Sequence, residues 1–179
     1  MYKQLSSRVV FEHPRMTLIE DEVLLPNGQI GIYLKRRERG HGVTVICRNE
    51  DGRLLAEKDY SYVPNTMLYQ FPGGGIDLNE APEEGANREL TEEAGLRANR
   101  LTLLGRYYLD HRKSAEWMYV YLAEELEPAT CDTDDPYEGV IDLFWLTEDE
   151  IDAMIREGEI VNAPMLAAWA IYRAHRQPS

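Results

Sequence analysis

The sequence predicts an α/β chain of the α+β type, in which helices cover a mixed β-sheet. Three observations predict this class. First, turn signals separate apolar runs in the first 60 residues. Second, three later segments carry signals for the start or end of a helix. Third, strand-like runs lie between the first of the three helical segments and the other two. The 179 residues, 44% hydrophobic and 28% charged, are typical of one domain with a moderate core.

Two turn signals punctuate the first 60 residues. Pro26-Asn27-Gly28 lies between the apolar runs 17–25 and 29–34, and Asn-Gly in such a place strongly indicates a β-hairpin. Asn49-Glu50-Asp51-Gly52 lies between 42–47 and 53–56 in the same way. We therefore expect two hairpins in this part of the chain.

A helix is expected after a glycine-rich loop. The strand-like Tyr69-Gln70-Phe71 ends at Pro72-Gly73-Gly74-Gly75, whose glycines allow the backbone to approach another group closely. Pro82 is favourable in the first turn of a helix, and Gly95 is favourable just past its end. These two residues predict a helix of about three turns between them.

The rest of the chain is expected to contain three strands and two helices. Thr147-Glu148-Asp149-Glu150 is a capping-box pattern that begins a helix towards Arg156. The Ala- and Leu-rich segment from Pro164 to about Arg176 indicates a closing helix. The expected strands are 101–109, 117–123 and 140–146.

The composition excludes several classes of function. With 19 Lys and Arg against 32 Asp and Glu, the net charge of −13 is opposite to that of proteins that bind nucleic-acid backbones by bulk charge. No run approaches the roughly 18–20 apolar residues of a membrane span, and the N-terminus lacks the pattern of a leader, so we expect a cytoplasmic protein without membrane or nucleic-acid partners. Cys47 and Cys131 are too few for a disulfide scaffold or a four-ligand zinc site.

The negative charge is concentrated in two segments. Residues 73–96 carry seven acids and one base, and residues 124–138 carry seven acids and no base, so together they account for the whole net charge. Such local acidity indicates either two solvated acidic faces or a bound cation.

Three glutamates of the first segment share one face of the predicted helix. At about 100° per residue, Glu89, Glu92 and Glu93 fall within an arc of about 100°, where like charges repel. A hard divalent cation such as Mg²⁺ would reverse the sign of that interaction. Arg88 lies four residues before Glu92 and is spaced to form an ion pair with it. The alternative is a helix surface of acids without a metal.

The helix and its preceding loop carry a recognisable motif, Gly74-x5-Glu80-x7-Arg88-Glu89-Leu90-x-Glu92-Glu93-x-Gly95-Leu96. This motif resembles a complete Nudix box. The resemblance implies the Nudix fold, a mixed sheet sandwiched between helices, and hydrolysis of a nucleoside diphosphate linked to another group with Mg²⁺ or Mn²⁺. It also implies that the Gly73 carbonyl, Glu89, Glu92 and Glu93 bind the metal, so that the box glutamates, with Arg88, carry the catalysis.

Most of the chain, from about residue 8 to 174, resembles the ADP-ribose pyrophosphatase and nucleotide-sugar diphosphatase group. The resemblance implies an N-terminal antiparallel β extension over residues 1–40, a Nudix hydrolase domain over 41–179, and a homodimer that exchanges its N-terminal sheet. The substrate would then be a small nucleotide sugar, cleaved to a nucleoside monophosphate and a sugar phosphate. The alternatives are a Nudix nucleoside triphosphate pyrophosphohydrolase and a non-catalytic nucleotide-sensing module.

Three positions depart from the pattern of that group. Ser61 stands where an arginine often serves the substrate, Gln70 stands where a glutamate is common, and His111 and Arg112 occupy the place of a characteristic proline. The loop Asp110-His111-Arg112-Lys113 carries up to three positive charges. It is expected to contact a phosphate or an acidic sugar, or else to be solvated. The substrate-binding candidates are Arg39, Tyr60, His111, Arg112 and Glu116.

A general base is expected outside the box, because the box carboxylates are committed to cations. In the resembling enzymes an acid on a loop often has this role, and the corresponding segment here is 131–139. Glu138 beside Gly139 is the first candidate and Asp135 the second, and a solvated loop is the alternative.

Overall fold

The computed structural model describes residues 1–38, 40–130 and 142–176. Two expected site residues, Arg39 and Glu138, lie outside these ranges, as does Asp135. The chain divides into two compact units, one of residues Met1–Arg39 with Tyr108–Glu116 and the other of Gly40–Tyr107 with Trp117–Ser179.

The first unit contains a three-stranded antiparallel sheet of β1 (Lys3–His13), β2 (Met16–Leu24) and β3 (Ile30–Arg36), in that order. The hairpin predicted at Pro26-Asn27-Gly28 is confirmed, with the Leu25 amide donating to the Gln29 carbonyl at 2.8 Å and Gly28 at a φ of 83°. The turn signals in the sequence did not give the bounds of β1. All residues of this strand are exposed. Polar cross-strand pairs attach it to β2, among them Ser7 with Asp21 and Arg8 with Glu20.

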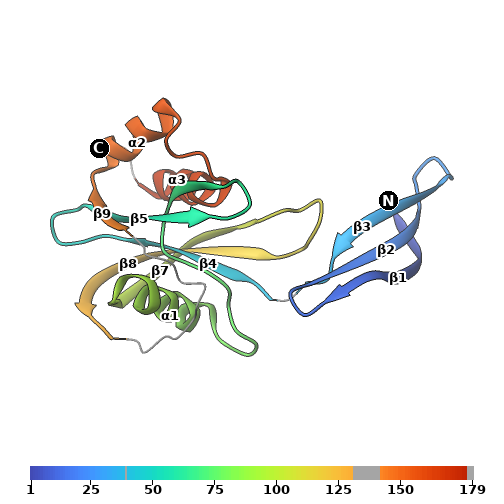
Figure 1. Ribbon diagram of the computed structural model, residues 1–179, viewed down its shortest axis with the longest axis horizontal. Coiled ribbons are helices and arrows are strands. Elements are labelled where there is room, and N and C mark those ends of the chain that lie inside the picture. The colour runs from blue at the N-terminus through green and yellow to red at the C-terminus, as the bar shows by residue number, and fades with distance from the viewer. Residues whose placement is uncertain (39, 131–141, 177–179) are drawn as a thin grey trace. The chain divides into compact units, whose positions relative to one another are not determined.

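The second unit contains two further sheets, drawn on the left of Figure 1. One has the order β4-β8-β7 and the other the order β6-β5-β9. β4 pairs with β8 in parallel, whereas β5 pairs with β6 and β9 in antiparallel fashion, so the expectation of mixed pairing is confirmed. The strands are β4 (Gly42–Cys47), β5 (Leu54–Ser61), β6 (Thr66–Gln70), β7 (Leu96–Tyr108), β8 (Trp117–Pro128) and β9 (Asp142–Leu146).

The second predicted hairpin is wrong. The turn at Asn49-Glu50-Asp51-Gly52 forms, with the Asn49 amide donating to the Arg53 carbonyl at 3.0 Å. The flanking strands β4 and β5 meet at the single bridge Arg48↔Leu54 and then belong to different sheets. The turn chemistry is local, but β4 pairs with the distant β8, and β5 pairs with the next strand, β6, and with the distant β9.

The three predicted helices are confirmed as α1 (Pro82–Ala94), α2 (Glu148–Glu157) and α3 (Ala163–His175). α1 begins at Pro82 and is capped by Gly95, which adopts the left-handed conformation with a φ of 62°. Thr147 caps α2 through the expected capping box, in which the Thr147 amide donates to Glu150 Oε2 at 2.7 Å. Within the described residues, no helix is long and apolar enough to span a membrane.

Alternating residues of the central strands bury two apolar clusters on opposite faces of the strands. On β4, Val43, Val45 and Cys47 contact the cluster that contains Ala86 and Leu90 of α1. The other cluster joins strand residues to α2 and α3, and its members include Ile46, Leu54, Ala56, Val120, Ile151, Met165 and Trp169. Figure 1 shows α1 on one side of these strands and α2 and α3 on the other, which is the expected sheet between helices.

Candidate functional site

The glycine-rich loop lies along β4. The Val45 amide donates to the Pro72 carbonyl at 2.7 Å, and the Val43 amide donates to the Gly74 carbonyl at 2.9 Å. Gly73 has a φ of 152°, and a Cβ there would lie 2.2 Å from the Val43 carbonyl oxygen. Only glycine fits this close approach, so the loop backbone is fixed beside the strand.

The same loop lies against the acidic face of α1. A Cβ on Gly74 would lie 2.5 Å from Glu89 Oε2, and the Gly73 amide donates to Glu93 Oε2 at 2.7 Å. The Gly73 backbone and the carboxylates of Glu89 and Glu93 therefore lie close together, as a shared metal site requires.

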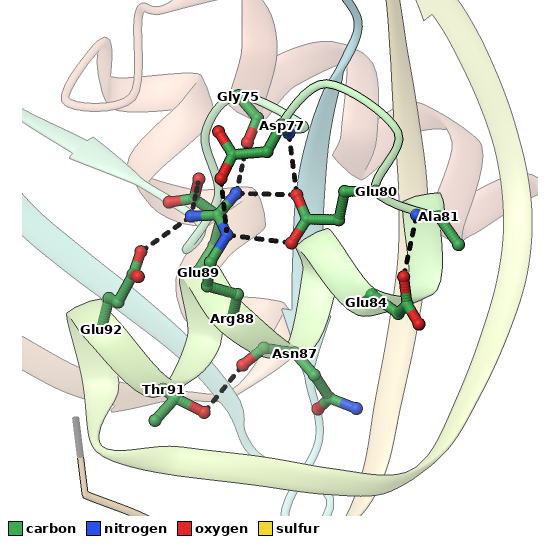
Figure 2. A network of polar contacts seen from close by, with 10 residues as sticks. All are labelled: Gly75, Asp77, Glu80, Ala81, Glu84, Asn87, Arg88, Glu89, Thr91 and Glu92. Atoms are coloured by element: carbon green, nitrogen blue, oxygen red, sulfur yellow. Dashed lines mark hydrogen bonds and ion pairs between the residues drawn. The ribbon is translucent and has the colours of Figure 1, made fainter.

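Arg88, in the middle of α1, is the centre of a carboxylate network (Figure 2). Its Nη1 donates to Glu92 at 2.8 Å and to Glu89 at 2.9 Å, so the ion pair expected from the Arg88–Glu92 spacing is present. Its Nε donates to Glu80 Oε1 at 3.0 Å, and its Nη2 donates to the Gly75 carbonyl at 2.6 Å. One guanidinium thus holds three glutamates and the glycine-rich loop in a single arrangement.

The glutamates of this network differ in electrostatic environment. The hydrogen bond from Arg88 lowers the pKa of Glu80 below its usual range. Burial raises the pKa of Glu89, because the charged form loses solvation that Arg88 only partly restores. Three carboxylates share one cation here, so the site carries an excess of negative charge.

The donor chemistry of this face fits a hard divalent cation, which prefers carboxylate and carbonyl oxygens. Among the described residues, no three His, Cys, Asp or Glu side chains form a cluster compact enough to hold a metal ion. The reason is visible in the contacts: Glu89 and Glu92 turn towards Arg88, and Glu93 turns towards the Gly73 amide. Metal binding by these residues would require the carboxylates to turn from these partners towards a common point.

Sequence reasoning missed a buried carboxylate on β5. Glu57 is fully buried, and its Oε1 accepts a hydrogen bond from the side-chain amide Nε2 of Gln70 at 2.7 Å, across the β5–β6 pair. Burial, together with the negative charges of Asp59 and Glu89, raises the pKa of Glu57 to about 7. The available signal was a charged residue directly after the apolar run Leu54-Leu55-Ala56 in a predicted strand.

Three expected substrate residues lie together in the first unit. His111 and Arg112 line an open pocket of about 520 Å³, with Lys35, Arg37 and Lys113 among its other cationic residues. Glu116 accepts a hydrogen bond from Ser114 at 2.9 Å and lies 3.7 Å from the guanidinium of Arg36. The pocket is therefore rich in positive charge, in a chain that is strongly acidic.

The remaining expected substrate residue, Tyr60, lies near the end of β5 in the second unit. Its side chain is exposed, and its hydroxyl donates to Asn65 Oδ1 at 2.6 Å. Its ring is therefore accessible to a ligand.

Comparison with known proteins matches both parts of the chain. Residues 38–169 match the model of the NUDIX domain, and residues 2–33 match the model of the nucleoside diphosphate sugar hydrolase N-terminal domain. An ADP-ribose pyrophosphatase of Bacillus subtilis is 30% identical over 69% of this chain and 66% of its own length. An ADP-ribose pyrophosphatase of Mycobacterium tuberculosis is 27% identical over 99% of this chain and 87% of its own.

A solved structure described as an ADP compounds hydrolase has the same fold. It superposes with a TM-score of 0.88 and covers 97% of this chain and 92% of its own, at 22% identity.

Proposed function

The chain belongs to the NUDIX family, and from this membership we propose that it is a metal-dependent pyrophosphohydrolase acting on ADP-ribose or a related nucleoside diphosphate sugar. The products would be a nucleoside monophosphate and a sugar phosphate. The observation that carries the proposal is the glutamate face of α1, on which Glu89 and Glu93 lie against the glycine-rich loop and Arg88 joins Glu89 to Glu92.

The substrate class is supported by the relatives and by the N-terminal match. Two relatives are named ADP-ribose pyrophosphatases, and the first 33 residues match a domain named for nucleoside diphosphate sugar hydrolases. An intact box in the sequence favours catalysis over a sensing role.

In the proposed mechanism, the Gly73 carbonyl, Glu89, Glu92 and Glu93 would hold the divalent cation, Mg²⁺ or Mn²⁺. When bound, such a cation polarises the bridging diphosphate and lowers the pKa of a water molecule. Arg88 positions the Glu89 and Glu92 carboxylates through its Nη1. The Glu138 carboxylate, or that of Asp135, would accept the proton of the attacking water.

We further propose that the cationic residues of the first unit bind the substrate. His111 and Arg112 would contact a phosphate or an acidic sugar, Arg39 would also contact the substrate, and Tyr60 would stack on a ring. Glu116 would hold the loop through Ser114 and Arg36. The positive charge of the pocket supports an anionic ligand.

A homodimer is part of the same proposal. Ile30, Ile32 and Leu34 alternate along β3, so they share one face of the first unit's sheet, and each is about half exposed or more. An apolar face of this kind is typical of an interface between subunits.

A substrate panel with identification of the products tests the proposal. ADP-ribose, other nucleoside diphosphate sugars and nucleoside triphosphates are each incubated with the full chain and Mg²⁺. We expect cleavage of a diphosphate sugar to a nucleoside monophosphate. Release of pyrophosphate from triphosphates alone would move the assignment to the triphosphate enzymes, and binding without any turnover would favour a sensing module.

A further inference from the structure

The alternation of β5 directs Glu57 towards α1. Leu54 and Ala56 belong to the apolar cluster with α2 and α3, whereas Leu55 belongs to the cluster with Ala86 and Leu90 of α1. Residues two apart in a strand point to the same face, so Glu57 shares the face of Leu55. The side chain of Glu57 therefore points to the side of the sheet on which the α1 glutamates lie.

Electrostatic contacts agree with this placement. The negative charge of Glu89 contributes to the raised pKa of Glu57. The pKa of the buried Cys47 thiol is raised mainly by burial, and the charges of Glu57 and Glu93 raise it further. Glu57, Glu89 and Glu93 are thus close enough to influence each other or a common neighbour.

Glu57 is only half satisfied in this position. Gln70 donates to its Oε1, but its Oε2 is buried and has no hydrogen-bond partner. A buried carboxylate oxygen without a partner is costly, and the nearby charges of Asp59 and Glu89 are negative and increase that cost. A cation at this point would remove the cost.

We propose that Glu57 is a further ligand of the divalent cation, through its Oε2, and that Gln70 is a positioning residue that fixes the carboxylate through Oε1. This inference rests on the proposed function, because it assigns a residue to the metal site proposed there. It extends that site from the loop and α1 to the central strand β5.

Direct measurement of metal binding tests the inference without recourse to activity. Mn²⁺ is titrated into the full chain and into Glu57→Gln, and free Mn²⁺ is followed by electron paramagnetic resonance. We expect the Mn²⁺ dissociation constant of Glu57→Gln to rise at least tenfold, with an unchanged circular dichroism spectrum. The exposed Asp149→Asn removes the same charge from α2 and is expected to bind Mn²⁺ like the unaltered chain.

Gln70→Met provides a second variant that retains the carboxylate. Loss of the positioning amide is expected to weaken Mn²⁺ binding two- to tenfold. Unchanged affinity in both Glu57→Gln and Gln70→Met would overturn the inference and leave the proposed function standing. If the unaltered chain itself binds no Mn²⁺ at millimolar concentration, the proposed metal dependence fails as well, so the two failures are distinguishable.

Discussion

Two carboxylate–arginine clusters of the second unit differ in their balance of charge. On α1, the single Arg88 serves Glu80, Glu89 and Glu92, with N–O distances of 2.8–3.1 Å. On β8, Glu124 pairs with two arginines, Arg48 and Arg100, the latter at 3.1 Å, and Arg100 also donates to Glu125 at 3.0 Å. The first cluster has an excess of negative charge, whereas the second is balanced, with two arginines against two glutamates.

Local acidity alone therefore does not identify a cation site. Both clusters fall in the two acidic segments that account for the net charge of the chain. Arginines from β7 and from just after β4 neutralise Glu124, so no further cation is needed there. The α1 glutamates lack such compensation, and this imbalance supports a metal site on that helix.

Removal of an α1 carboxylate is the strongest way to test the contrast. Glu92→Gln and Glu93→Gln are each expected to lower kcat at least 100-fold, because each removes a proposed metal ligand while preserving side-chain volume. Steady-state hydrolysis of the preferred substrate measures the effect, and circular dichroism verifies folding. Normal turnover in a folded variant would exclude that carboxylate from the metal site.

The second acidic segment also holds the proposed general base, which lies outside the described residues. Glu138→Gln is expected to lower kcat by one to three orders of magnitude with little change in Mn²⁺ affinity, since it removes a proton acceptor rather than a ligand. Asp135→Asn is the matched comparison. If Asp135→Asn is impaired and Glu138→Gln is normal, the role passes to Asp135, and normal turnover in both places the base elsewhere.

Glu57 extends the comparison to a carboxylate whose hydrogen bond comes from an amide instead of an arginine. Its folded pKa of about 7 lies above its ordinary value of 4.5, so the folded state binds the proton more tightly than the unfolded state. The contribution of Glu57 to the free energy of unfolding of the metal-free chain should therefore fall as pH rises from 4.5 to 7. Glu57→Gln should remove up to roughly 3 kcal/mol of that fall, measured by urea denaturation in chelator across this range. An identical pH profile in the variant would contradict the raised pKa.

Glu124→Gln should separate stability from activity. The variant leaves Arg48 without its carboxylate and Arg100 with Glu125 alone, so we expect a loss of about 2 kcal/mol in the free energy of unfolding. We expect kcat to stay within twofold of the unaltered enzyme. A large loss of turnover with retained stability would show that the second cluster also serves the reaction.

The sequence predicted those features that depend on neighbouring residues. The ends of α1 followed from Pro82 and Gly95, and the Arg88–Glu92 ion pair followed from their spacing. The pairing of β4 with β8 did not follow, because it joins segments more than 70 residues apart, and the local turn signal at 49–52 predicted a hairpin instead. Glu57 was missed for the same reason, since its burial depends on β6, β9 and α1 together. The roles of Arg39 and Glu138 stay predictions.

The central claim is that the negative excess on α1 is a divalent-cation site required for hydrolysis, and a melting experiment with and without Mg²⁺ tests it most directly. At a Mg²⁺ concentration about 100 times its dissociation constant, binding to the folded state should contribute about 2.7 kcal/mol and raise the Tm by roughly 5–11 °C. Glu92→Gln should show a much smaller rise, and hydrolysis by the unaltered chain should stop in excess chelator. An unchanged Tm with full activity in chelator would contradict the claim.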